Sequence, residues 1–131
     1  MTGTLNTILY VEDDDDIAEV ALMTLQMLGG FEVVHCNSGR RALDSFAAVT
    51  PQLVLMDVMM PEMDGPETLR RLRQMPGIAQ TVPVIFMTAR AQVHEQAAYR
   101  QLGALGVIVK PFDPITLSAQ ITEIWEQRHA A

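Results

Sequence analysis

The chain has 131 residues, of which 49% are hydrophobic and 19% are charged, a composition typical of one folded domain that excludes a disordered chain. Nine basic residues against sixteen acidic ones give a net charge of −7, which argues against direct binding of nucleic acid or of an anionic membrane. No apolar run approaches the roughly 20 residues of a membrane span, no secretory signal opens the chain and Cys36 is its only cysteine, so we expect a cytoplasmic protein without disulfides.

Short apolar strands alternate with helical stretches five times along the chain. The expected strands are residues 7–11, 31–36, 53–56, 83–87 and 106–109. The expected helices start near residue 17 and residues 37–39, cover residues 67–74 and 91–102, and start again near residues 113–114. Strands that alternate with crossover-length helices predict an α/β fold with a parallel sheet covered on both faces.

Helical spacing predicts which side chains of these helices face the sheet. The expected inward residues are Ile17, Val20, Ala21, Leu25 and Leu28 in the first helix, Ala42, Leu43, Phe46 and Ala47 in the second, and Leu117, Ile121, Ile124 and Trp125 in the last. We interpret Asp15 and Asp16 as caps of the first helix and leave Asp14 open. Asp113 followed by Pro114 predicts the start of the last helix.

Polar side chains follow four of the predicted strands. Glu12 and Asp13 follow the first strand, Asp57 ends the apolar third strand, Thr88 follows the fourth, and the sole lysine, Lys110, follows the fifth. In a parallel sheet these positions meet at one edge, where ligands bind.

Carboxylates brought together repel one another and stay ionised only beside a cation. That cation is either Lys110 or a hard divalent ion such as Mg²⁺, which prefers oxygen ligands. Two simpler interpretations remain open here: an acidic run is often a solvated surface, and the lysine could form a buried salt bridge alone.

The motifs at residues 8–14, 53–65, 84–89 and 103–112 together resemble the receiver domain of two-component response regulators, in its single-domain, chemotaxis-regulator-like form. The resemblance covers residues 7–126. It implies a doubly wound, flavodoxin-like sheet with strand order 2-1-3-4-5 and five helices. We therefore expect one receiver domain over residues 1–131, with its core at about 7–126 and no output domain.

The resemblance also implies a role for each site residue. Asp57 would accept a phosphoryl group from a histidine kinase or a histidine phosphotransfer protein, assisted by Thr88 and Lys110. Mg²⁺ would be held by Asp13, Asp57 and the backbone carbonyl of Met59, and by Glu12 through water. The backbone N–H groups of Met59 and Ala89 would contact the phosphoryl group, and Pro111 resembles the family's cis-proline.

One position departs from the family pattern, because Val107 stands where an aromatic switch residue is common. We therefore expect any switch to act through the loop after the fourth strand and the fourth helix. An unidentified output partner would dock on the face formed by residues 91–102, 107–109 and 116–128.

Two other functions compete with a signalling receiver that catalyses only its own phosphorylation and dephosphorylation. The first is a haloacid-dehalogenase-type phosphohydrolase, which needs a second aspartate where this chain has Met59. The second is a degenerate receiver that serves as a scaffold, against which the complete set of acids, threonine and lysine counts.

Overall fold

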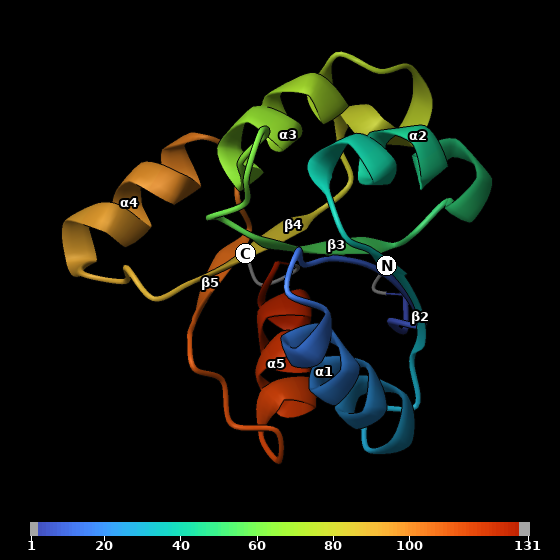
Figure 1. Ribbon diagram of the computed structural model, residues 1–131, viewed down its shortest axis with the longest axis vertical. Helices are drawn as coiled ribbons and strands as arrows, with labels where there is room; N and C mark the ends of the chain where they lie inside the picture. The colour runs from blue at the N-terminus through green and yellow to red at the C-terminus, as the bar shows by residue number, and fades with distance from the viewer. Residues whose placement is uncertain (1–2, 129–131) are drawn as a thin grey trace.

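The computed structural model describes residues 3–128, which form a five-stranded sheet with helices on both faces (Figure 1). The strands are β1 (Thr7–Val11), β2 (Glu32–Cys36), β3 (Leu53–Asp57), β4 (Val84–Thr88) and β5 (Gly106–Val109). All neighbouring strands are parallel, in the order β2-β1-β3-β4-β5. The predicted fold class and strand order are confirmed.

Helices α1 (Asp15–Met27) and α5 (Leu117–Gln127) cover one face of the sheet, and α2 (Gly39–Val49), α3 (Gly65–Arg73) and α4 (Val93–Gln101) lie on the other (Figure 1). A short 3₁₀ helix, η1 (Gly77–Gln80), precedes β4 and was not expected from the sequence. In the part of the chain that the structure describes, no helix is both long and apolar enough to span a bilayer.

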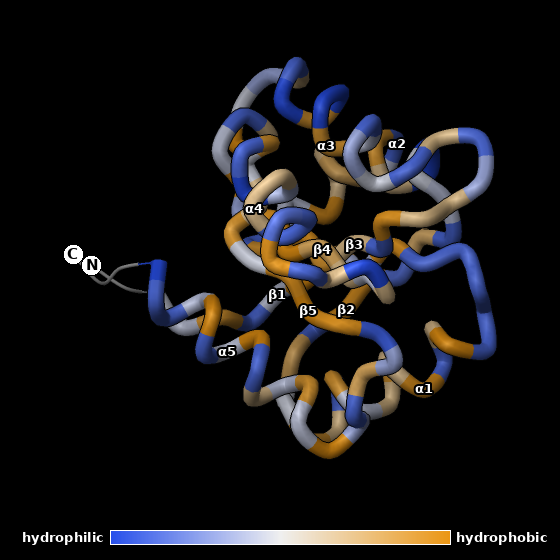
Figure 2. The backbone as a smooth tube through the Cα atoms, turned by 90° about the vertical axis from the view of Figure 1, so that its left-hand side faces the viewer, coloured by the Kyte–Doolittle hydropathy of each residue, from blue (hydrophilic) through white to orange (hydrophobic). Residues whose placement is uncertain are grey.

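Side chains of the strands alternate between two hydrophobic cores, one on each face of the sheet. In β1, Leu9 and Val11 pack toward α2 and α3, whereas Ile8 and Tyr10 pack toward α1 and α5. Every residue of β3 is buried, as expected for a central parallel strand. The strands accordingly form the hydrophobic centre of the molecule in Figure 2.

Two predicted helix faces are partly wrong. Val20 and Leu28, expected to face the sheet, are 47% and 64% exposed, while Ala18 and Ala21 are buried in α1. The apolar residues of α1 fit two adjacent stripes, and the stripe with the small alanines packs inward because it allows close approach to the sheet. Ala47 of α2 is likewise exposed.

Two predicted helix starts also differ from the structure. The N-cap of α1 is Asp14, whose side chain accepts hydrogen bonds from the backbone N–H groups of Asp16 and Ile17, so Asp15 and Asp16 belong to the first turn. At the other end of the chain, Asp113 forms a turn in which its carboxylate accepts a bond from Ile115 N. Helix α5 begins only at Leu117.

Candidate functional site

The site residues expected from the sequence lie at the carboxyl ends of four adjacent strands. Glu12 and Asp13 follow β1, and Asp57 ends the neighbouring strand β3, where Val11 is paired with Met56. On the other side of β3, Asp57 is paired with Met87, the residue before Thr88. Strand pairing therefore brings the acids and the threonine to one edge of the sheet.

Three carboxylates form the centre of this edge. Glu12, Asp13 and Asp57 each place one oxygen so that the three atoms lie within 4.8 Å of one another. Glu12 and Asp57 are only 1% and 4% exposed, whereas Asp13 is exposed. We call these three residues the acid centre.

Lys110 reaches the acid centre from the far side of β4. Its Nζ donates to Glu12 Oε1 at 3.1 Å and to Asp57 Oδ1 at 3.2 Å. The lysine therefore bridges two buried acids from β1 and β3, although 98 and 53 residues separate it from them in sequence. Removal of one partner from such a buried arrangement leaves an uncompensated charge.

The charges of this group are not balanced. Burial, and next the nearby charge on Asp57, raise the pKa of Glu12 to about 7, although bonds from Asp14 N and Lys110 oppose the rise. Burial lowers the pKa of Lys110, but the carboxylates of Asp57 and Glu12 outweigh it and the net pKa is raised. One ammonium thus faces three carboxylates, and the excess negative charge favours binding of a further cation.

The donor set of the acid centre fits Mg²⁺. It consists of carboxylate oxygens alone, the hard ligands this ion prefers, and at least one of them is open to solvent. The site combines two buried acids with one exposed acid, which leaves room for coordinated water.

Thr88 and Lys110, at the ends of β4 and β5, complete the carboxyl-terminal edge of the sheet. Thr88 is 1% exposed, and its hydroxyl oxygen accepts a bond from Arg90 N at 2.9 Å. Its backbone carbonyl accepts a bond from Lys110 N, and the Lys110–Pro111 peptide bond is cis. Ala89, directly after Thr88, is exposed.

The loop after Asp57 separates its methionines by exposure. Met59 is 67% exposed, whereas Met60 and Met63 are 8% and 9% exposed and pack inward. Only the first of the three therefore remains at the surface beside the acid centre. Val107, the position without the common aromatic residue, is half-buried in β5.

Two residues near the acid centre were missed by the sequence analysis. His35 Nε2 lies 2.8 Å from the backbone carbonyl oxygen of Glu12. Tyr10 is completely buried, and no atom within residues 3–128 hydrogen-bonds its hydroxyl group. Tyr10 could have been found from the sequence, because it lies in a predicted strand that is followed directly by acidic residues. No local feature of the sequence pointed to His35.

Comparison with known proteins places this geometry in a family. Residues 8–122 match the model of the response regulator receiver domain. The chain is 42% identical over 109 residues to the regulatory protein AtoC of Escherichia coli and 38% identical over 117 residues to the transcriptional regulatory protein CseB of Streptomyces coelicolor. These matches cover 83% and 89% of this chain but 23% and 48% of the two relatives, so the chain spans less than half of their length.

Solved structures of similar proteins have the same architecture. The chemotaxis protein CheY4 of Vibrio cholerae superimposes with a TM-score of 0.83 at 28% identity, over 92% of this chain and 99% of that one. A response regulator of Chloroflexus aurantiacus, described as putative, gives 0.81 at 32% identity, over 94% and 99%.

Proposed function

Because the chain belongs to the response regulator receiver domain family of two-component signalling, we propose that Asp57 is its phosphoacceptor and that phosphorylation there switches the binding of a partner. The observation that carries this proposal is the bridged acid centre. Asp57 is a buried carboxylate whose oxygen is held by Lys110 beside two further acids. A carboxylate in this setting can act as a nucleophile, and the neighbouring groups can stabilise the negative charge of a phosphoryl group.

The proposed step transfers a phosphoryl group from the imidazole of a phosphohistidine. A carboxylate oxygen of Asp57 attacks the phosphorus atom, the P–N bond breaks as the P–O bond forms, and the departing imidazole takes up a proton. The donor is a histidine kinase or a histidine phosphotransfer protein. The only covalent bond that the protein forms in this step is the P–O bond of Asp57. Its contribution to catalysis is therefore mainly to position the reacting groups and to stabilise their charge.

Glu12, Asp13, Asp57 and the backbone carbonyl of Met59 would hold Mg²⁺, with Glu12 acting through water. When bound, the ion supplies positive charge to the oxygens of the phosphoryl group. The clustering of three carboxylates around a single lysine supports the acidic part of this assignment.

Lys110, Thr88 and two backbone N–H groups would receive the remaining phosphoryl oxygens. The ammonium of Lys110 already lies 3.2 Å from Asp57 Oδ1, so it can follow the charge onto the phosphoryl group. Thr88 Oγ1 accepts from Arg90 N, which leaves the hydroxyl proton available for donation. The N–H groups of Met59 and Ala89 would complete the contacts.

Phosphorylation at the site would change the conformation of the loop after β4 and of α4. Val107 provides no aromatic ring for a rotamer switch, whereas α4 has no fully buried residue and contacts the core through the half-buried Tyr99. The output partner would dock on the face of α4, β5 and α5. We also propose that the chain is one domain, that it works in the cytoplasm and that it catalyses only its own phosphorylation and dephosphorylation.

The test is to incubate the protein with Mg²⁺ and a small acyl phosphate and to measure its mass. We expect the wild type to gain the mass of one phosphoryl group and Asp57→Asn to gain none. Asp44→Asn, which removes an exposed acid on α2, is the matched control and should behave as the wild type.

Either of two results would contradict the proposal. Rapid turnover of free phosphate esters would indicate a phosphohydrolase instead. A wild type that gains no mass while folded would indicate a scaffold.

A further inference from the structure

His35 is tied to the acid centre from the edge strand β2. The pairing of β1 with β2 sets Tyr10 opposite His35 and Val11 opposite Cys36, so the end of β2 lies beside the segment that carries the acids. Glu12 N donates to Cys36 O at 3.1 Å, and His35 Nε2 lies 2.8 Å from Glu12 O. Both backbone polar groups of Glu12 are therefore held by two successive residues of β2.

The chemistry of this contact places a proton on Nε2 of the imidazole ring. A backbone carbonyl oxygen can only accept a hydrogen bond, so Nε2 of His35 must carry the proton and donate it. The ring is further held by Tyr10, whose ring centroid lies 5.6 Å away at an interplanar angle of 39°. His35 is thus a directed donor on a supported ring.

The backbone carbonyl of Glu12 matters because its peptide plane is shared with Asp13. The side chain of Glu12 is already fixed by Lys110 at Oε1 and by Asp14 N at Oε2. Within residues 3–128, by contrast, no hydrogen bond holds the carboxylate of Asp13, which is exposed. The orientation of the Glu12–Asp13 peptide helps to set the direction in which the Asp13 side chain leaves the backbone.

We propose that His35 is a positioning residue for this site: its Nε2–H bond to Glu12 O orients the Glu12–Asp13 peptide so that Asp13 can bind a divalent cation beside Asp57. The proposal rests on the function proposed above. It assigns His35 no contact with the phosphoryl group or with the ion.

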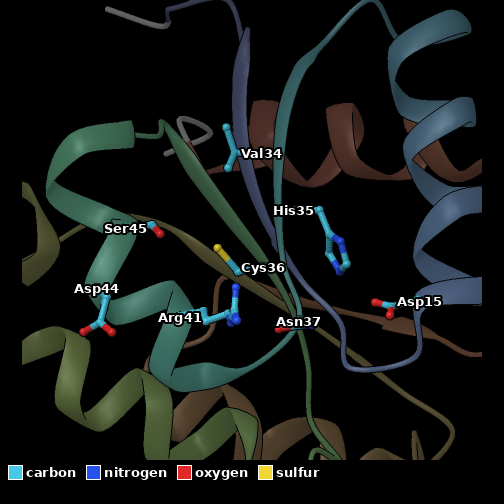
Figure 3. A pocket seen from close by; sticks show the side chains of 8 residues that line it. All are labelled: Asp15, Val34, His35, Cys36, Asn37, Arg41, Asp44 and Ser45. Atoms are coloured by element: carbon cyan, nitrogen blue, oxygen red, sulfur yellow. The ribbon is translucent and has the colours of Figure 1, made fainter.

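The surroundings of His35 make it possible to test the hydrogen bond separately from the packing. The ring is half-buried and forms part of the wall of an open pocket of about 280 Å³, together with Asp15, Asn37 and Arg41 (Figure 3). A replacement at this position therefore fills space next to solvent, and it does not have to be accommodated in a closed core.

Two substitutions separate the packing of the imidazole ring from its hydrogen-bond donation. His35→Phe keeps a ring that can pack on Tyr10 but removes the donor, and His35→Gln keeps an N–H donor at a similar reach but removes the ring. Mg²⁺ alone is titrated into each protein by calorimetry at one fixed pH. We expect the Mg²⁺ dissociation constant of His35→Phe to be about fivefold to tenfold higher than that of the wild type, the effect of one lost hydrogen bond. The dissociation constant of His35→Gln should stay within about twofold of the wild-type value.

The same variants are then treated with the acyl phosphate at low and at saturating Mg²⁺. We expect His35→Phe to be modified slowly at low Mg²⁺ and at nearly the wild-type rate at saturating Mg²⁺, because the lesion is in cation binding. Urea unfolding in the presence of a chelator shows that all the compared proteins are folded.

The inference is overturned if His35→Phe binds Mg²⁺ as tightly as the wild type, or if His35→Gln is as weak as His35→Phe. It is also overturned if nitrogen NMR of the wild type shows the neutral ring protonated at Nδ1, a measurement that needs no variant. A wild type that binds no Mg²⁺ and takes no phosphoryl group would instead refute the proposed function itself.

Discussion

At the scale of single residues, the surroundings of Tyr10 are unusual for a tyrosine. It lies two residues before Glu12 in β1, its side chain is completely buried, and its hydroxyl group has no hydrogen-bond partner in residues 3–128. Burial, and next the charges on Glu12 and Asp57, raise its pKa well above the usual value. The phenol is therefore neutral, and its hydroxyl group lost its hydration without gaining a partner.

We expect Tyr10→Phe to increase the free energy of unfolding by about 1 kcal/mol, because a buried polar group without a partner costs free energy. Urea unfolding measures the change. Tyr99→Phe is the matched control, since Tyr99 is half-buried and packs edge-on against Phe86, and we expect it to change stability little. Destabilisation by Tyr10→Phe would contradict the prediction and would indicate a buried water bonded to the hydroxyl.

At the scale of elements, the start of α3 is packed directly on the segment that follows the proposed phosphoacceptor. A side-chain carbon added at Gly65 would lie 2.6 Å from the backbone oxygen of Asp57 and 3.0 Å from Val58 Cα. Gly65 N also donates to Val58 O at 2.8 Å. A glycine is required at position 65 because its backbone lies directly against the backbone of Asp57 and Val58. The contact holds the start of α3 to the end of β3.

We expect Gly65→Ala to decrease the free energy of unfolding by about 1–3 kcal/mol, since neither backbone segment can move aside freely. The amide NMR signals of Asp57 and Val58 should shift in the same variant. Gly3→Ala is the control, because no atom lies within 4 Å of the added carbon there. Equal stability of the two variants would show that α3 moves away from β3 without cost.

At the scale of the whole molecule, the sheet joins two cores that share no helix. Leu25 of α1 belongs to the core under α1 and α5, and Leu69 of α3 belongs to the core on the other face. The single tryptophan, Trp125, lies in the first of these cores. Its fluorescence therefore reports on one face of the sheet, and a substitution on the other face tests whether the two unfold together.

We expect Leu25→Ala and Leu69→Ala each to lower stability by about 2–5 kcal/mol, the cost of a large-to-small change in a packed core. Because both cores contain side chains of β1, β2, β3 and β4, both variants should shift the unfolding transition followed by Trp125 fluorescence, and circular dichroism should give the same midpoint. If Leu69→Ala leaves the fluorescence transition in place, the two faces unfold separately and the proposal of one domain fails.

The fold and the composition of the acid centre could be predicted from the sequence because their signals are local. Residues 53–57 read as a buried strand that ends in an acid, and the alternation of strands with helices predicts a parallel sheet, whereas the order of the strands was implied by the family resemblance. Placement of polar residues at the strand ends predicted that Glu12, Asp57 and Lys110 would lie together, as they do.

The tertiary structure decided what depends on the rotation and contact of separate elements. The sequence did not determine which stripe of α1 packs inward, that Asp14 caps this helix, or that α5 begins at Leu117, since each of these has a close local alternative. The bond from His35 to the backbone of Glu12 joins residues 23 apart, and it exists only because β2 pairs with β1 in one register. Short-range patterns carry chemistry and periodicity, but side-chain contacts between elements follow from packing.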